Sequence, residues 1–228
     1  MLTKVKINSF DCHAATLAKA DTACYLIYPQ LAELNDEWLE RMSQSHGINL
    51  VAVYVPADKW NDCLTPWPEP GEAPGCPPFA GKADEFLSLL TRDIIPKVDK
   101  AAGLSGIKYR DLMGVSLGGL FTFWQWMTCS FFRNIACLSG SFWFVGFIEW
   151  FEKQPVPQKE GKAFFLLGEE EPLSHVKAFQ SVGKNTETIV KRLQDSGILT
   201  QFEWVPGNHF SRPVHRAEKA LEALYQSS

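Results

Sequence analysis

Short apolar runs alternate along the chain with longer stretches in which apolar residues recur at helical spacing. The run at 49–55 is nearly all apolar and rich in β-branched residues, which is typical of a strand covered on both faces. Val5, Ile7 and Phe10 alternate loosely and predict one further strand near the N-terminus. The remaining runs that predict strands are 22–28, 109–115, 134–139, 163–167 and 201–205.

Helices are predicted between these strands. Apolar residues with helical spacing occupy 31–42, 86–98, 117–127, 189–193 and 214–224. Pro96 is expected to bend or end the second of these helices. Strands that alternate with helices predict an α/β fold with a mostly parallel central sheet and helices on both faces. Because no repeat and no clear domain break interrupts this order, residues 1–228 are predicted to form a single domain without a large separate lid domain.

Residues 56–80 differ from the rest of the chain. They contain seven of the 14 prolines, together with Trp60 and Trp67. This segment is too rich in proline for a helix or a central strand, and too apolar for a flexible linker. We therefore expect a packed functional loop that borders the active site, because loops at the carboxyl edge of a parallel sheet surround ligands.

Composition narrows the possible function classes. With 46% hydrophobic and 13% aromatic residues among 228, the chain has enough apolar side chains to bury a full-size core. A formal charge of −4 without blocks of Lys and Arg argues against nucleic acid as a partner. No apolar stretch approaches the roughly 20 residues of a transmembrane helix, so we expect no membrane partner.

Cysteine usage bears on metal sites and on the compartment. The six cysteines form no C-x-x-C pair, so neither a zinc site nor a thioredoxin-type redox site is predicted. Residues 1–6 contain no apolar signal segment. We therefore expect free thiols, a cytoplasmic protein, no bound metal and no cofactor. Nothing in the sequence predicts an oligomeric state.

The segment 114–118 reads Gly-Val-Ser-Leu-Gly, which is the G-x-S-x-G pattern of a nucleophilic serine at a sharp strand-to-helix turn. The glycines on either side of Ser116 let the strand and the helix approach without Cβ clashes. The predicted strand at 109–115 and the helix from Leu117 supply the context that the motif requires. The N–H group of Leu117, at the helix start, is then a candidate oxyanion donor.

A serine nucleophile needs a base, and on α/β sheets of this kind the chain order is serine, acid, histidine. Three histidines follow Ser116. His209 comes just after the strand predicted at 201–205, where a loop at the carboxyl end of that strand can reach the serine. His175 at a helix start and His215 on the terminal helix are expected to face solvent, so His209 is the candidate base.

The acid is expected after the strand that precedes the last one. That strand, at 163–167, is followed by Gly168 and then by three glutamates. Glu171 is the candidate third member of the triad, with Glu169 and Glu170 as alternatives, because carboxylates this close repel and two of them can be solvated. A Ser–His dyad without a strict acid is a further alternative.

These residues resemble the esterase family of α/β-hydrolases that includes enterochelin (siderophore) esterases, S-formylglutathione hydrolases and feruloyl esterases. The resemblance is carried by 114–121, 138–143, 60–67, 168–171 and 207–209. It implies an α/β-hydrolase fold, no metal, Ser116 as nucleophile and His209 as base. It also places a second oxyanion donor after the strand at 22–28. Many relatives carry His-Gly there, whereas this chain has Pro-Gln-Leu-Ala, so the N–H of Gln30 or Leu31 is the candidate donor.

The sequence therefore predicts a serine hydrolase that cleaves small-molecule carboxylic esters through an acyl-enzyme. An acyltransferase or thioesterase with the same nucleophile is one alternative, and a non-catalytic binding protein on the hydrolase fold is another. Candidate substrate-binding residues come from the loops expected beside the serine: Trp60, Asn61, Asp62, Trp67 and Trp143. For Asn61 and Asp62, capping a turn is an alternative role.

Overall fold

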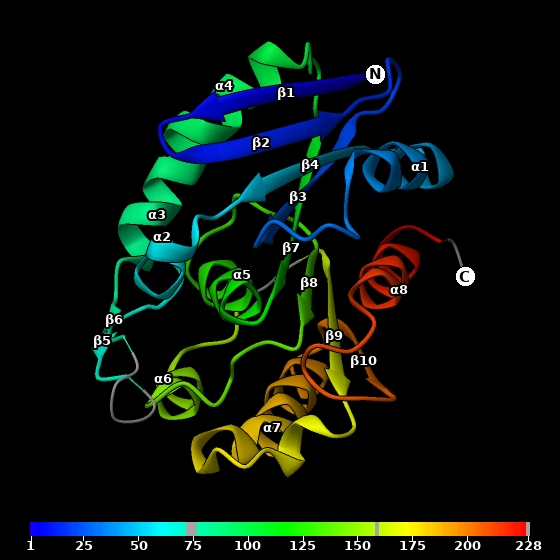
Figure 1. Cartoon of the computed structure of the whole chain (residues 1–228). Coiled ribbons are helices and arrows are strands. Elements are labelled where there is room, and N and C mark those ends of the chain that lie inside the picture. The colour runs from blue at the N-terminus through cyan, green and yellow to red at the C-terminus, as the bar shows by residue number, and fades with distance from the viewer. Residues whose placement is uncertain (72–76, 158–159, 227–228) are drawn as a thin grey trace.

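An eight-stranded sheet forms the centre of the computed structural model, which describes residues 1–71, 77–157 and 160–226 (Figure 1). Its strands lie in the order β1-β2-β4-β3-β7-β8-β9-β10. β2 runs antiparallel to both of its neighbours, and the strand pairs from β4 to β10 are parallel. The bounds are β1 Leu2–Ile7, β2 Phe10–Ala15, β3 Thr22–Tyr28, β4 Asn49–Tyr54, β7 Tyr109–Val115, β8 Ile135–Leu138, β9 Lys162–Gly168 and β10 Leu199–Val205.

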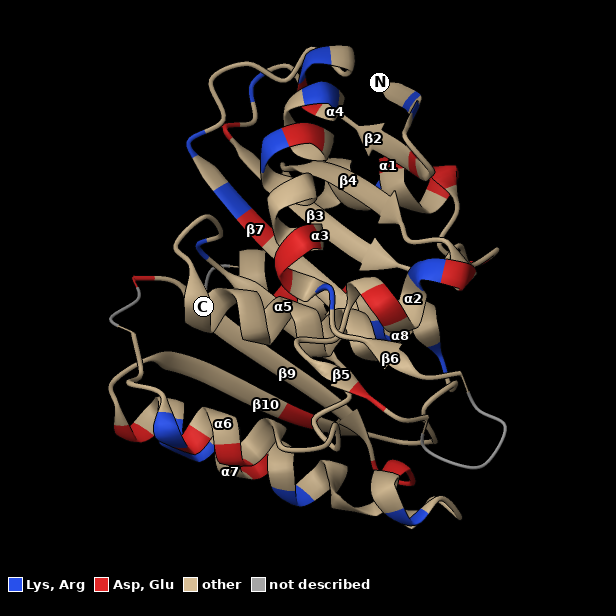
Figure 2. Cartoon of the chain, turned by 90° about the vertical axis from the view of Figure 1, so that its left-hand side faces the viewer, with Lys and Arg blue, Asp and Glu red and all other residues tan. Residues whose placement is uncertain are grey.

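Helices cover both faces of the sheet, which confirms the predicted α/β architecture (Figure 1). One face packs against α1 (Asp36–His46) and α8 (Pro213–Tyr225). Side chains alternate along each strand, so Tyr25 and Ile27 of β3 join the core on one face while Cys24 and Leu26 join the core on the other. The face opposite α1 and α8 packs against α3 Ala83–Leu89, α4 Ile95–Ala101, α5 Leu117–Thr128, α6 Phe147–Lys153 and α7 Val182–Asp195. In Figure 2, ribbon segments of Lys and Arg (blue) and of Asp and Glu (red) are interspersed along α4 and α7.

A π-helical turn at Leu90–Ile94 joins α3 and α4 into one continuous helical segment. Pro96 lies in the first turn of α4, and the helix continues past it to Ala101. Proline lacks the N–H that the helical ladder requires, and its ring crowds the carbonyl one turn earlier. Because the wider π-helical turn directly precedes Pro96, the helix is not ended there.

The N-terminal segment differs from the single strand that Val5, Ile7 and Phe10 predict. The structure has an antiparallel hairpin of β1 and β2, in which Ile7 and Phe10 pair with each other. Asn8 has a left-handed backbone with φ 55° and reverses the chain between them. The apolar alternation runs through this reversal, so the pattern alone does not reveal the second strand.

The segment 56–80 holds more regular structure than its proline content predicts. α2 (Ala57–Cys63) begins directly after Pro56, where a proline is tolerated because the first helical residues need no N–H partner. β5 (Pro68–Glu69) and β6 (Phe79–Ala80) pair as a small antiparallel sheet. Residues 72–76 of this segment, which include Cys76, lie outside the described residues.

Cys12, Cys24, Cys63 and Cys137 are free thiols, as expected from the sequence. Burial, aided by the nearby Asp11 carboxylate, raises the pKa of Cys12 to about 12, and burial also raises the pKa of Cys137. These thiols therefore stay protonated. None of the helices in the described part of the chain has the length and apolar character needed to span a bilayer.

Candidate active site

Ser116 lies at a sharp turn between β7 and α5, as the G-x-S-x-G motif predicts. Its backbone has φ 57° and ψ −124°, a conformation that is strained for a residue with a side chain. A Cβ atom at Gly114 would lie 2.2 Å from the carbonyl oxygen of Gly118, and one at Gly118 would lie 2.7 Å from the carbonyl oxygen of Ile27. Both positions therefore need glycine for strand, turn and helix to pack this closely.

The two predicted oxyanion donors come from neighbouring strand ends. Leu117 is the first residue of α5, so its N–H lies in the first helical turn and has no carbonyl partner within the helix. Gln30 follows β3, which pairs in parallel with β7, so both loops leave the same edge of the sheet. Gln30 and Ser116 line one cavity.

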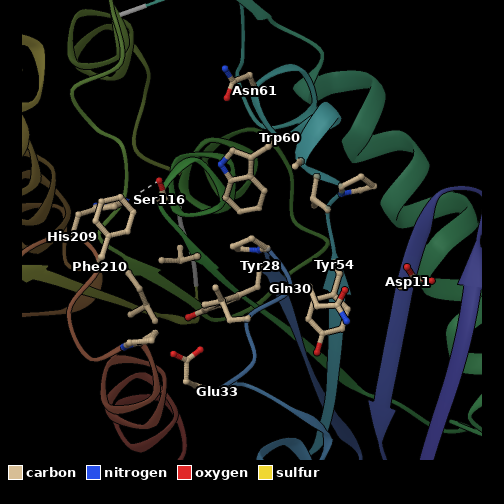
Figure 3. Close-up of a pocket in the computed structure, with 18 of the residues that line it drawn as sticks. Asp11, Tyr28, Gln30, Glu33, Tyr54, Trp60, Asn61, Ser116, His209 and Phe210 are labelled. Carbon is tan, nitrogen blue, oxygen red and sulfur yellow. Dashed lines mark hydrogen bonds between the residues drawn. The ribbon is translucent and has the colours of Figure 1, made fainter. Parts of the chain in front are cut away.

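A chain of hydrogen bonds joins Ser116, His209 and Glu171. Oγ of Ser116 lies 3.1 Å from Nε2 of His209, and Nδ1 of His209 lies 2.8 Å from Oε2 of Glu171 (Figure 3 shows the first contact). Because a carboxylate only accepts, Nδ1 donates to it and Nε2 is left to accept from the serine hydroxyl. Glu169 and Glu170 are exposed, and it is Glu171 that reaches the histidine.

Glu171 is held in a buried network, with 4% of its side chain exposed. Its Oε1 accepts from the Gly168 N–H at 2.8 Å, from the Ser139 hydroxyl at 2.7 Å and from Arg216 at 2.8 Å. Arg216 is just as buried, with 3% of its side chain exposed, and also donates to the Asn208 carbonyl at 2.6 Å and to the Ser139 hydroxyl. The network holds the carboxylate in one orientation toward the histidine.

The same contacts decide the charge of Glu171. Burial alone would raise the pKa of its carboxyl, but the hydrogen bond and charge of His209, with hydrogen bonds from Arg216 and Ser139, hold it below the ordinary value of 4.5. The ionised carboxylate of Glu171 therefore stabilises the fold. This contribution is complete at pH values above the pKa of the carboxyl in the unfolded chain, and it is lost as the pH falls through the lower pKa of the folded protein.

We therefore expect the melting temperature to fall steeply as the pH drops below about 4.5, and to fall less steeply in Glu171→Gln. The measurement is thermal unfolding by circular dichroism between about pH 7 and about pH 3. Parallel curves for the two proteins would show that the carboxylate of Glu171 does not carry the effect.

A cavity of about 920 Å³ opens beside Ser116 and His209. Of the predicted substrate-binding residues, Trp60 and Asn61 of α2 line it (Figure 3). Phe210 also lines it, with 87% of its surface exposed, and its ring meets that of His209 edge-on at 5.1 Å. Within the described residues, no group of three or more His, Cys, Asp or Glu side chains is arranged to hold a metal ion.

Asp62, Trp67 and Trp143 lie outside the lining of this cavity, unlike Trp60 and Asn61. Nε1 of Trp67 donates to the Val145 carbonyl at 2.9 Å, and the backbone carbonyl of Asp62 accepts from Lys82 at 2.8 Å. The rings of Trp67 and Trp143 pack in an aromatic cluster with Phe79, Phe144, Phe147, Trp150 and Phe179. The loops after β4 and β8 therefore pack these half-buried tryptophan side chains against the cluster and α6 instead of turning them toward the serine.

Arg216 and Ser139 are site residues that the sequence does not identify. An arginine on the terminal helix next to His215 is typical of a solvent-exposed residue. The one available signal is that position 216 shares a helical face with the buried Ala220 and Leu224. The partner that explains its burial, Glu171, comes from a different loop 45 positions earlier in the chain.

The parallel sheet, the serine at the strand-to-helix turn, and the acid and histidine on later loops define an α/β-hydrolase fold. No family model matches the chain. Among curated proteins the chain is similar to the uncharacterized protein YbbA of Bacillus subtilis (strain 168), at 25% identity over 164 residues. The match covers 71% of this chain and 66% of YbbA, a little under two thirds of that relative's length.

Solved structures with the same fold include several serine hydrolases. An IroE-like serine hydrolase from Shewanella oneidensis superposes with a TM-score of 0.79 at 16% identity, covering 99% of this chain and 79% of that one. The siderophore hydrolase EstA from Aspergillus nidulans gives 0.75 at 19% identity, covering 99% and 93%. The enterobactin and salmochelin hydrolase IroE gives 0.74 at 19% identity, covering 100% and 95%. These similarities confirm the α/β-hydrolase fold.

Proposed function

We propose that this protein is a serine hydrolase that cleaves small-molecule carboxylic esters through an acyl-enzyme. The observation that carries the proposal is the hydrogen-bonded chain from Glu171 through His209 to Ser116, at 2.8 Å and 3.1 Å. Its three members stand in the order and on the loops that this chemistry uses on an α/β sheet. The serine also opens into a cavity large enough for a small molecule, about 920 Å³.

The acylation step follows from the hydrogen-bond directions. Oγ of Ser116 attacks the ester carbonyl while Nε2 of His209 takes its proton, and Glu171 stabilises the imidazolium that forms. The carbonyl oxygen becomes an oxyanion, and we assign the N–H groups of Leu117 and Gln30 as its donors. The imidazolium then returns the proton to the leaving alcohol, and the serine keeps the acyl group.

Deacylation repeats these steps with water as the nucleophile. His209 takes a proton from the water and returns it to Oγ of Ser116, which releases the carboxylic acid. The exposure of the histidine supports water as the acceptor: 31% of its side chain is exposed, and the adjoining Phe210 is 87% exposed. An acyltransferase would need this approach closed to water.

The names of the fold neighbours support a small ester as substrate. EstA is described as a siderophore hydrolase, and IroE as an enterobactin and salmochelin hydrolase. The cavity of about 920 Å³ lies within the range of small-molecule sites.

A fluorophosphonate probe tests the proposal, because it reacts with a serine only where a base activates the hydroxyl. We expect labelling of the wild-type protein and none of Ser116→Ala. Ser141→Ala is the matched control, since Oγ of Ser141 lies 3.4 Å from Oγ of Ser116 in the same surroundings, and it should label normally. A folded wild-type protein that fails to label, or a label found on Ser141, would contradict the proposal.

A further inference from the structure

The cavity beside Ser116 extends onto the face of the sheet that α8 covers. Its lining there includes Val115 and Leu138, whose side chains belong to the α8 side of the core, and Pro213 of α8. Tyr28 and Arg216 complete this part of the cavity, which we call the α8 pouch. In Figure 3, Tyr28, Gln30 and Glu33 lie below Ser116 in the view, whereas Asn61 lies above it and Trp60 to its right.

The hydroxyl of Tyr28 has no hydrogen-bond partner among the described residues, although Tyr28 is only 2% exposed. Buried hydroxyl groups are paired in the large majority of cases, because an unpaired one costs free energy. Tyr25, on the same strand and equally buried, follows this rule, since its hydroxyl donates to Asp99 at 2.7 Å. Tyr28 is the exception, and its residue lines the cavity that reaches the candidate nucleophile.

A second unpaired donor belongs to the same pouch. Nε of Arg216 is buried and donates to no atom among the described residues, whereas its terminal nitrogens are bound to Glu171 and to the Asn208 carbonyl. Burial raises the pKa of Tyr28, and the Cys24 thiol adds to this, while the nearby Arg216 charge lowers it without cancelling the rise. The phenol therefore keeps its proton. Two residues that line the pouch thus each have a buried donor, the Tyr28 hydroxyl and Nε of Arg216, with no acceptor among the described residues.

The charges around the pouch favour an uncharged acceptor. The charge of Arg216 is already balanced by Glu171 at 2.8 Å. Glu33 lines the same cavity and forms no ion pair within the described residues. A carboxylate or phosphate entering the pouch would therefore find no unbalanced positive charge on Arg216, while an ether, hydroxyl or carbonyl oxygen needs only a hydrogen-bond donor.

We propose that the hydroxyl of Tyr28 and Nε of Arg216 bind an uncharged oxygen atom of the substrate, in the part of the ester that enters the α8 pouch. The inference rests on the proposed esterase function and adds a substrate class to it: esters with an ether, hydroxyl or carbonyl oxygen a few bonds from the scissile carbonyl. A single oxygen has two lone pairs and can accept from both donors. An ester with a methylene group at that place would leave both donors unpaired.

Tyr28→Phe removes the hydroxyl and keeps the ring. The acyl arm compares p-nitrophenyl methoxyacetate with p-nitrophenyl butyrate, and the alcohol arm compares 2-methoxyethyl butyrate with butyl butyrate. In each pair one oxygen replaces one methylene group. We expect the ratio of kcat/KM for the ether ester over the plain ester to fall about tenfold in Tyr28→Phe, in one of the two arms. The arm that responds identifies which half of the ester enters the pouch.

Tyr25→Phe is the matched control, since it removes a buried hydroxyl from the same strand outside the cavity, and its ratios should equal those of the wild type. Unchanged ratios for Tyr28→Phe in both arms, with a labelled and active enzyme, would overturn this inference and leave the esterase function standing. Loss of labelling in the wild type would instead overturn the function. Saturation-transfer NMR with Ser116→Ala, which cannot turn the esters over, then tests the pouch alone with ethyl methoxyacetate against ethyl butyrate and 2-methoxyethyl butyrate against butyl butyrate. Equal binding within both pairs would overturn the inference.

Discussion

Glu171→Gln is expected to lower kcat about 10³–10⁴-fold while KM changes little. The residue does not line the cavity, so the substitution removes no contact with substrate. Its effect acts through the proton positions on His209. The measurement is steady-state kinetics with p-nitrophenyl butyrate, together with thermal unfolding to establish that the variant is folded.

The direction of the effect follows from the donors around the carboxylate. Oε1 of Glu171 accepts from Gly168, Ser139 and Arg216, so a Gln carbonyl oxygen must take that position. The amide NH₂ group is then turned toward Nδ1 of His209, which has to become an acceptor. The ring proton moves to Nε2, where it can no longer accept from the serine hydroxyl, and the base is lost.

Glu170→Gln is the control for this experiment, because its side chain is exposed and adjoins the same turn. It should leave kcat within about twofold of the wild type. Comparable losses in the two variants, or an unchanged kcat in Glu171→Gln, would remove Glu171 from the catalytic triad and favour a Ser–His dyad.

Arg216→Met is expected to destabilise the fold by about 3–5 kcal/mol. The variant leaves the carboxylate of Glu171 buried without its cationic partner, and an uncompensated buried charge is costly. Part of the cost is avoided if Glu171 takes up a proton, so its pKa should rise. As the pH is lowered, kcat should therefore fall at a higher pH in Arg216→Met than in the wild type. The reason is that a neutral Glu171 carboxyl does not stabilise the imidazolium of His209.

Urea unfolding at neutral pH measures the stability change, and the pH dependence of kcat measures the shift in the titration. Arg41→Met is the matched control, because Arg41 pairs at 3.0 Å with Glu218 of α8 but 60% of its side chain is exposed. That variant should lose no more than about 1 kcal/mol. A loss this small in Arg216→Met would show that the buried pair does not stabilise the fold.

Local patterns in the sequence predict much of the architecture and the reacting groups. The apolar runs at 22–28, 49–55 and 163–167 fall on β3, β4 and β9, because a strand buried on both faces needs apolar side chains at nearly every position. The sharp turn at Ser116 is predicted equally well, since only glycine tolerates the close backbone approaches on either side of it. His209 and the run of three glutamates at 169–171 follow from chain order, because parallel strands deliver their loops to one edge.

Local sequence patterns do not predict features that depend on contacts between distant segments of the chain. The alternation of Val5, Ile7 and Phe10 continues through the reversal at Asn8, so β1 and β2 look like one strand. Tryptophans in the segments after the strands predict aromatic packing near the site, but they do not predict which rings face the cavity. Trp60 lines the cavity, whereas Trp67 packs against Phe144 and Phe147, because helix α2 and the turn after it orient the two rings differently.

The α/β layering, the strained serine turn and the order of serine, acid and histidine can be predicted from the chain alone, because each depends on residues close together in sequence or on strand order. Three features emerge only when the chain is folded: Glu171 is the glutamate that meets His209, Arg216 neutralises Glu171, and the hydroxyl of Tyr28 has no partner among the described residues. The physical reason is that the burial and pairing of a polar group depend on neighbours brought by other strands and helices, which no local pattern encodes.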